Sequence, residues 1–211
     1  MFSGSIVALI TPFLKGEIDI VAIKKLVNWH LEQGTNGFVV CGSTGEAALL
    51  THQERHLVIK TVIDENKGRL PVIVGCGAAA TSETINMMQE AKAFGADAAL
   101  VVTPYYVKPN AEGIFQHFKM LNETVNLPLI IYNNPGRAAV GMSTELVVRL
   151  AGLSNVVAIK DSCDDLTRVI KMRHQITKPF AFLSGDDPIA TAYLAHGGDG
   201  VISVSANVAP K

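Results

Sequence analysis

The amino-acid sequence predicts an α/β fold, a (β/α)₈ barrel, and three observations favour it. Eight short apolar runs of strand length recur along the 211 residues. Segments with apolar residues at roughly helical spacing separate these runs, so that strands and helices alternate along the whole chain. No glycine-rich dinucleotide-binding turn follows the first run, which disfavours the alternative of an open, doubly wound sheet.

A short apolar run bounded by polar residues, such as Val156–Ile159, is expected of a buried parallel strand. The predicted strands are Ser5–Ile10, Gly37–Cys41, Pro71–Val74, Ala98–Val102, Leu127–Tyr132, Val156–Ile159, Ala181–Leu183 and Gly200–Val204. The predicted helices between them are Val21–Glu32, Gln53–Glu65, Thr84–Phe94, Gly113–Thr124, Thr144–Leu150 and Asp165–His174. Helix ends are marked by glycines at Gly34, Gly68, Gly95 and Gly197-Gly198, and by the predicted N-caps Ser82, Ser143 and Asp187.

We expect a single barrel domain over residues 1–211, because no linker, repeat or low-complexity segment divides the chain. Only Ser205–Lys211 follow the last predicted strand, whereas barrels of this class typically run to about 250 residues. We therefore expect a barrel truncated after strand eight, lacking the last outer helix and the C-terminal helical segment. The apolar flank left uncovered favours self-association.

Composition and charge narrow the class of protein. The net charge is −1 and no basic run is present, so we expect no nucleic-acid partner. The longest apolar stretches have strand length, and the N-terminus lacks a basic region followed by an apolar core, so neither a membrane partner nor a signal peptide is predicted. Cys41, Cys76 and Cys163 are odd in number and widely spaced, which indicates a reducing compartment and a cytoplasmic location.

Lys160 directly follows the strand predicted at Val156–Ile159. Barrel enzymes build their active sites at the carboxyl ends of the strands. A lysine partly withdrawn from water loses some preference for its charged form, so its pKa falls. The neutral amine can then attack a carbonyl and form a Schiff base. The alternative is a solvated lysine that merely ends the strand.

Polar clusters follow other predicted strands as well. Gly42–Glu46 places small hydroxyl residues between glycines, and exposed backbone N–H groups at such a turn bind a carboxylate or a phosphate, although an ordinary tight turn also fits. Tyr132 ends the fifth strand, where a tyrosine can transfer protons. Arg137, on the Pro-Gly turn that follows, offers a fork for a substrate carboxylate, with a surface arginine as the alternative.

Three other features have simpler explanations. The paired tyrosines of Thr103–Tyr106 are typical of an interface or a rim. The acidic pair Asp186-Asp187 precedes a proline, which fits a helix N-cap better than a catalytic pair. His52 and His56 share a helix face, but no third ligand is in view, so we predict no metal site.

Five segments in order resemble the family of pyruvate-dependent class I aldolases and synthases that includes the dihydrodipicolinate synthases and the N-acetylneuraminate lyases. They are Gly42–Glu46, Thr103–Tyr106, Tyr132–Pro135, Ile159-Lys160 and Leu183–Asp186. The likeness covers almost the whole chain. Pro104–Tyr106 together with Arg137 favours the dihydrodipicolinate synthase branch of the family.

The resemblance implies four catalytic residues. Lys160 forms the Schiff base with pyruvate, and Tyr132 acts as general acid and base during imine formation and at pyruvate C3. Ser43 and Tyr106 complete a proton relay with Tyr132, with Tyr106 reaching in from a neighbouring subunit of a homo-oligomer, a dimer of dimers. Ser43 stands where the family usually has a threonine; it keeps the hydroxyl but lacks the methyl that restricts the rotamer.

The resemblance also implies a substrate-binding set that needs no metal ion and no organic cofactor. Thr44 and the adjacent backbone amides hold the pyruvate carboxylate. Arg137 binds the carboxylate of aspartate semialdehyde. Gly185 and Ile202 line the pyruvate pocket through backbone or apolar contact.

A second site binds the end product lysine at the dimer interface of lysine-regulated members of the family. His52, Glu83 and Tyr105 match that site, whereas Arg55 and Ala79 replace a histidine and an asparagine. A lost amide and an added cation weaken the binding of a cationic ligand. We therefore predict weak lysine feedback or none.

The resemblance and the residues together predict a lyase that condenses pyruvate with aspartate semialdehyde to 4-hydroxy-tetrahydrodipicolinate, in lysine and diaminopimelate biosynthesis. Two alternatives remain open. One is an aldolase of the same chemistry that acts on N-acetylneuraminate or a 2-keto-3-deoxy sugar acid. The other is a catalytically incompetent barrel fragment that associates through its uncovered flank.

Overall fold

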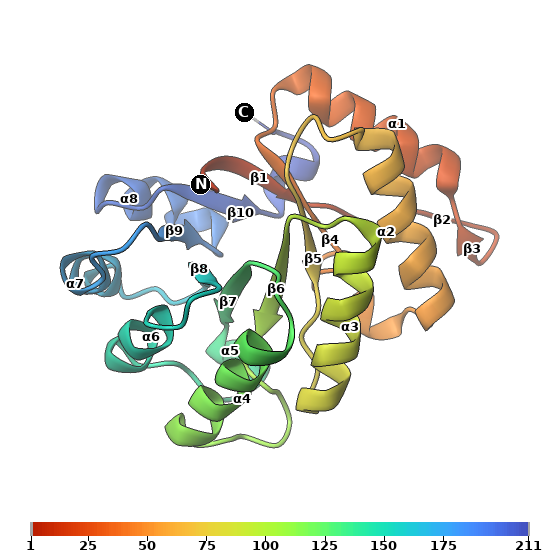
Figure 1. Ribbon diagram of the computed structural model, residues 1–211. Helices are drawn as coiled ribbons and strands as arrows, with labels where there is room; N and C mark the ends of the chain where they lie inside the picture. The colour runs from red at the N-terminus through yellow and green to blue at the C-terminus, as the bar shows by residue number, and fades with distance from the viewer. Residues whose placement is uncertain (1, 211) are drawn as a thin grey trace.

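The computed structural model describes residues 2–210 and shows the expected (β/α)₈ barrel (Figure 1). Met1 and Lys211, the two ends of the predicted domain, lie outside the described residues. Parallel strands close on themselves in the order β1-β10-β9-β8-β7-β6-β5-β4. The barrel strands are β1 (Gly4–Ala8), β4 (Gly37–Val40), β5 (Val72–Gly75), β6 (Ala98–Val102), β7 (Leu129–Asn133), β8 (Val156–Asp161), β9 (Ala181–Ser184) and β10 (Gly200–Ser203).

Helices surround the barrel in an outer ring (Figure 1). They are α1 (Ile20–Gln33), α2 (His52–Asn66), α3 (Thr81–Phe94), α4 (Ala111–Thr124), α5 (Pro135–Ala138), α6 (Thr144–Ala151), α7 (Thr167–Gln175) and α8 (Ala190–Ala195). The smaller elements are the hairpin strands β2 (Phe13–Leu14) and β3 (Glu17–Ile18) and the 3₁₀ helices η1 (Ala47–Leu49), η2 (Asp187–Ile189) and η3 (Ser205–Asn207). Within residues 2–210, none of the helices combines the length and the apolar character that a membrane span requires.

Side chains of the barrel strands alternate between two apolar layers. One layer fills the barrel interior and contains Ile130 and Ala158, and the other lies between the strands and the helices. Tyr132 follows Ile130 by two residues and belongs to the interior layer. Lys160 follows Ala158 by two residues, so its side chain also points inward. The strand period therefore brings the two predicted reactive groups into the same interior.

The predicted strands and the six predicted helices agree with the observed elements to within a few residues. Strands β7 and β8 run one residue beyond Tyr132 and Lys160, so both residues lie inside strands rather than in the loops that follow. The exits at Gly34 and Gly95 are confirmed, since both residues end their helices in the left-handed conformation, with φ of 80° and 90°.

The structure corrects two of the three predicted helix N-caps. Ser143 caps α6 as predicted, because its hydroxyl accepts a hydrogen bond from the Leu146 N–H at 3.2 Å. Ser82 lies inside α3, which begins one residue earlier. Asp187 lies inside η2, and its carboxylate instead accepts the backbone N–H of Ser205 at 2.7 Å, which ties the loop after β9 to the loop after β10.

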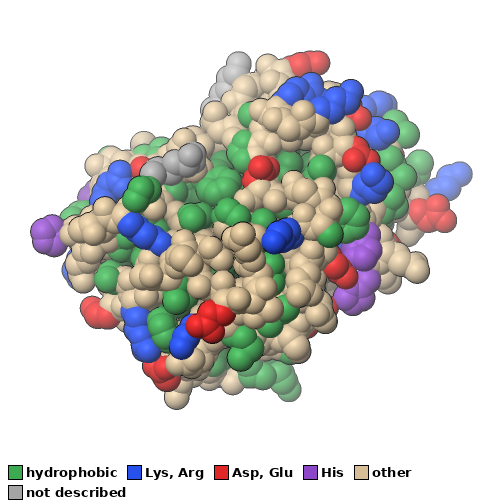
Figure 2. Space-filling view, in the orientation of Figure 1, with side chains coloured by type: hydrophobic (Ala, Val, Ile, Leu, Met, Phe, Trp, Pro, Cys, Tyr) green, Lys and Arg blue, Asp and Glu red, His purple; other side chains and the backbone are tan. Residues whose placement is uncertain are grey.

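The surface carries no dominant charge on the face shown in Figure 2. Acidic and basic side chains are interspersed there, in keeping with the formal net charge of −1 for the chain. A protein that follows a phosphate backbone instead concentrates its basic side chains on one face or along one helix. Nothing on this face therefore favours a polyanion partner.

Candidate active site

A cavity of about 400 Å³ gathers most of the predicted site residues. Ser43 and Thr44 reach its wall from the loop after β4, Tyr132 from β7, Arg137 from α5 and Lys160 from β8. These side chains are spread over more than a hundred residues of the sequence, from Ser43 to Lys160, and the closed barrel brings them together at the carboxyl ends of the strands.

Lys160 is a buried amine, with 7% of the residue exposed. Burial lowers the pKa of Lys160, while the charges of Tyr132 and Asp187 act in the opposite direction. Its Nζ lies 4.4 Å from the centre of the Tyr132 ring. A lysine in these surroundings holds more of its neutral form at a given pH than a solvated lysine does, which is the form that attacks a carbonyl.

Tyr132 lies directly opposite Lys160 in the pairing of β7 with β8. Its phenol oxygen accepts a hydrogen bond from Asn134 Nδ2 at 2.7 Å. Burial alone raises the pKa of Tyr132, but the charge of Lys160 and the hydrogen bond from Asn134 outweigh burial and lower the pKa overall. Asn134 was not predicted as a site residue, although its place two residues after Tyr132 is a usable signal.

Gly185 lets the loop after β9 approach the stem of Lys160. A Cβ atom added at Gly185 would lie against Ser162 Oγ and 2.9 Å from Lys160 Cε, closer to both atoms than Cβ atoms come to other atoms in folded proteins. A side chain at this position would therefore displace the reactive lysine. Neither Gly185 nor Ile202 is among the described residues that line the cavity, and Ile202 is 1% exposed within the interior apolar layer.

The loop Cys41–Glu46 is held by its own backbone and by the first barrel strand's loop. The Glu46 N–H donates to Ser43 O at 3.1 Å, and the Thr11 hydroxyl donates to Gly45 O at 2.7 Å. Cys41 and Glu46 have positive φ values of 53° and 55°, so the chain turns sharply at both ends of the loop. This turn presents Ser43 and Thr44 to the cavity.

Of the four predicted catalytic residues, Tyr106 alone is not among the described residues that line the cavity. It is 90% exposed, and its φ of 71° is a strained value for a residue with a side chain. The neighbouring Tyr105 does line the cavity. A ring held outward in this way is available to another copy of the chain.

Two of the three predicted effector residues, His52 and Glu83, lie where α2 approaches α3, whereas the third, Tyr105, lines the cavity. His52 Nε2 lies 3.8 Å from Glu83 Oε1, and His56 Nε2 lies 3.0 Å from Glu90 Oε2. Arg55 is 5% exposed, lines the cavity and donates from Nη2 to Gly75 O at 2.9 Å. The guanidinium of Arg55, which replaces the family's histidine, is therefore fixed between α2 and β5 in the cavity wall.

Comparisons with known proteins agree over the whole chain. A sequence profile of the dihydrodipicolinate synthetase family matches residues 1–211. The chain is 50% identical over 210 residues to the 4-hydroxy-tetrahydrodipicolinate synthase of Rhodospirillum centenum (strain ATCC 51521 / SW), a match that spans 100% of this chain and 72% of the relative. It is 49% identical over 212 residues to the protein of the same name from Coxiella burnetii (strain Dugway 5J108-111), with the same coverage of 100% and 72%.

Solved structures give the same result. The chloride-inhibited dihydrodipicolinate synthase from Acinetobacter baumannii, complexed with pyruvate, has a TM-score of 0.97 and 48% identity, over 100% of this chain and 73% of that one. The dihydrodipicolinate synthase of Thermotoga maritima has a TM-score of 0.97 and 40% identity over the same shares, 100% and 73%. Profile, sequence and structure therefore all show that this chain belongs to the dihydrodipicolinate synthetase family.

Proposed function

We propose that the chain is a lyase that condenses pyruvate with aspartate semialdehyde to 4-hydroxy-tetrahydrodipicolinate, in lysine and diaminopimelate biosynthesis. The observation that carries this proposal is the buried amine of Lys160, 4.4 Å from the Tyr132 ring in a cavity-lining pair. The relatives that match the whole chain are named 4-hydroxy-tetrahydrodipicolinate synthases, which supports these substrates over the sugar acids.

The chemistry proceeds through an imine. The neutral amine of Lys160 attacks the pyruvate ketone, and loss of water gives an imine that draws electrons from C3. Tyr132 donates a proton to the departing oxygen and assists proton loss at C3, which gives an enamine. The enamine carbon adds to the aldehyde of aspartate semialdehyde, and the amine of the product then displaces Lys160 as the ring closes.

In this proposal the loop after β4 binds pyruvate. We assign the pyruvate carboxylate to Thr44 and the adjacent backbone amides, and a proton-relay hydroxyl to Ser43, since both residues line the cavity with Lys160. Gly185 keeps the opposite side open for the substrate, and Ile202 supports it from the barrel interior. No metal ion or organic cofactor takes part in this scheme.

A homo-oligomer completes the site in this proposal. Tyr106 is 90% exposed and is absent from its own cavity wall, so we assign it to the cavity of a neighbouring copy, within a dimer of dimers. A proton relay from Tyr106 to Tyr132 then exists only in the assembly. The free cysteines Cys41, Cys76 and Cys163 support a reducing, cytoplasmic location.

Replacing Arg137 with alanine is expected to raise the KM for aspartate semialdehyde about 10- to 100-fold, because a charge-assisted hydrogen bond to a carboxylate contributes roughly 1.5–3 kcal/mol. Imine formation with pyruvate alone should be unchanged. Steady-state kinetics in both substrates and borohydride trapping with pyruvate measure the two effects. Arg149→Ala is the matched control, because Arg149 pairs with Glu112 on the exposed surface. Equal KM values for Arg137→Ala and the unmodified chain would rule out this role.

Lysine is expected to inhibit weakly or not at all. Arg55 follows His52 by three residues on α2, and its buried guanidinium lines the cavity that Tyr105 also lines, so its charge opposes a cationic ligand bound beside these residues. Initial rates over a lysine titration at limiting pyruvate measure the effect. Inhibition by micromolar lysine would show that the site tolerates the substitution and that this prediction is wrong.

Product analysis separates the proposed function from its alternatives. With pyruvate and aspartate semialdehyde, mass spectrometry should show the condensed product. A sugar acid aldolase would instead release pyruvate from N-acetylneuraminate or a 2-keto-3-deoxy sugar acid. An incompetent fragment would give neither product and no cooperative thermal transition.

A further inference from the structure

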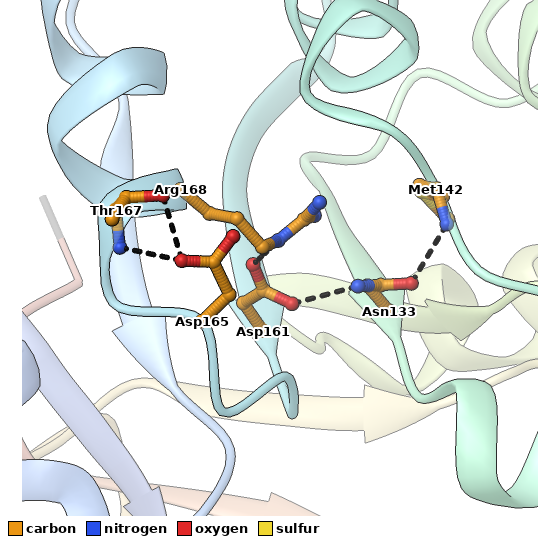
Figure 3. Close-up of polar contacts among 6 residues, drawn as sticks. All are labelled: Asn133, Met142, Asp161, Asp165, Thr167 and Arg168. Carbon is orange, nitrogen blue, oxygen red and sulfur yellow. Dashed lines mark hydrogen bonds and ion pairs between the residues drawn. The ribbon is translucent and has the colours of Figure 1, made fainter.

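A buried polar network lies behind the strand positions that carry the two reactive groups (Figure 3). Asn133 Nδ2 donates to Asp161 Oδ1 at 2.7 Å, and Arg168 Nε donates to Asp161 Oδ2 at 3.0 Å. The Met142 N–H donates to Asn133 Oδ1 at 2.9 Å. We call these four groups the outer-face network. Asp161 and Asn133 are each 1% exposed, and the side chain of Arg168 is 11% exposed.

The outer-face network sits one residue beyond the reactive pair on the same two strands. Tyr132 pairs with Lys160, and the next pair along β7 and β8 is Asn133 with Asp161. Successive residues of a strand point to opposite faces, so the network faces the helices while the reactive groups face the cavity. The backbone of Asp161 also holds the loop after β9, because the Gly185 N–H donates to Asp161 O at 2.8 Å.

Burying the ion pair of Asp161 with Arg168 is costly, because taking two charges out of water can cost more free energy than their attraction returns. Stability alone therefore does not explain the pair. Apart from the hydrogen bond that Asn133 donates to Asp161, the surroundings offer little that offsets this desolvation cost. Tyr193 of α8 is 1% exposed, and burial raises the pKa of Tyr193, so the phenol stays neutral. Arg173 and Asp199, also on this side, pair with each other at 3.0 Å. The exposed carboxylates of Glu145 in α6 and of Asp165 also lie within reach of the Arg168 charge.

The cavity side has its own charges. Tyr132 from β7, Asp187 from η2 and Arg137 from α5 face Lys160. An isolated charge on the other side of β8 would add to these and change the proton affinity of the amine. A neutral ion pair at that place adds no net charge.

We propose that Asp161 and Arg168 are positioning residues for Lys160: as a neutral pair they fix β8 beside β7 through Asn133 without placing a net charge behind the reactive amine. This inference rests on the imine-forming function proposed above. In this inference Arg168, in α7, affects imine formation although it does not contact the reacting atoms.

Removing one member of the pair is expected to shift the pH dependence of imine formation. The sign of the charge that remains determines whether the shift is to higher or to lower pH. Arg168→Met leaves the Asp161 carboxylate unpaired, which stabilises the ammonium of Lys160 and moves the midpoint of imine trapping to higher pH by about one unit. Asp161→Asn leaves the guanidinium unpaired and moves the midpoint to lower pH. The double variant should return the midpoint to that of the unmodified chain.

The experiment is borohydride trapping of the full chain with pyruvate at a series of pH values, with cooperative thermal unfolding checked for every variant. Arg168→Lys keeps the charge and should keep the midpoint. Arg149→Met, which breaks the exposed pair with Glu112, is the matched control and should change nothing. If Arg168→Met does not unfold cooperatively, Arg168→Gln takes its place.

Two outcomes would overturn the inference. Variants that unfold more easily but keep the midpoint of the unmodified chain would make the pair merely structural. Shifts of both single variants in the same direction would remove the electrostatic cause. Failure of the unmodified chain to form any adduct is a different result, because it contradicts the proposed function itself.

Discussion

Replacing Lys160 with alanine or arginine is expected to abolish the pyruvate adduct and to lower turnover by more than about 10³-fold, because the covalent intermediate can no longer form. Alanine removes the amine, and arginine stays protonated at every working pH. Turnover with both substrates and borohydride trapping measure the two losses. Lys178→Ala is the control, since burial also lowers the pKa of Lys178 but that lysine donates to Leu153 O outside the cavity.

The pH dependence of trapping follows from the same residue. The attacking form is the neutral amine, so the trapping rate rises with pH as Lys160 loses its proton, and it falls again where Tyr132, the general acid, ionises. Because burial lowers the pKa of Lys160, the rise should be centred below the value of about 10.4 that is typical of a solvated lysine. Near-normal turnover in a Lys160 variant would refute the assignment.

Tyr132→Phe is expected to lower kcat by about 10²- to 10⁴-fold, the usual contribution of a positioned general acid or base. The substitution keeps the ring against Lys160 and removes only the hydroxyl that Asn134 holds. Steady-state kinetics give kcat, and exchange of the pyruvate C3 protons with deuterated water reports proton transfer on the bound imine. Tyr193→Phe is the control, because among residues 2–210 Tyr193 lies outside the cavity lining and its hydroxyl has no hydrogen-bond partner. Normal C3 exchange in Tyr132→Phe would mean that another group moves these protons.

The barrel was predictable because its signals are local. The run ending at Ile159 is apolar and β-branched, and it stops at a lysine, so the strand and the reactive group could both be read from a few residues. The helix exits at Gly34 and Gly95 were predictable for the same reason. The short helix α5 was missed, since four residues are too few to show a helical period. Helix α8, with six residues, was indicated only by the predicted N-cap Asp187 and the predicted exit at Gly197-Gly198 on either side of it.

The parts that could not be predicted depend on contacts between distant segments. Asp187 looked like a helix cap from its neighbours, but it accepts hydrogen bonds from Ser205, 18 residues later. Asp161 was not predicted as a site residue, yet it is 1% exposed and bound to Arg168. Tyr106 lies outside the cavity of its own chain, which only the family resemblance indicated, because the residues around Tyr106 carry no signal of it.

The most direct test of the central claim, that Lys160 is the imine-forming residue of this barrel, is borohydride reduction of the unmodified chain with pyruvate. Intact mass and peptide mapping then count and locate the adduct. We predict one pyruvate-sized adduct per chain, located on Lys160. An adduct on a different lysine, or none in a sample that unfolds cooperatively, would contradict the claim.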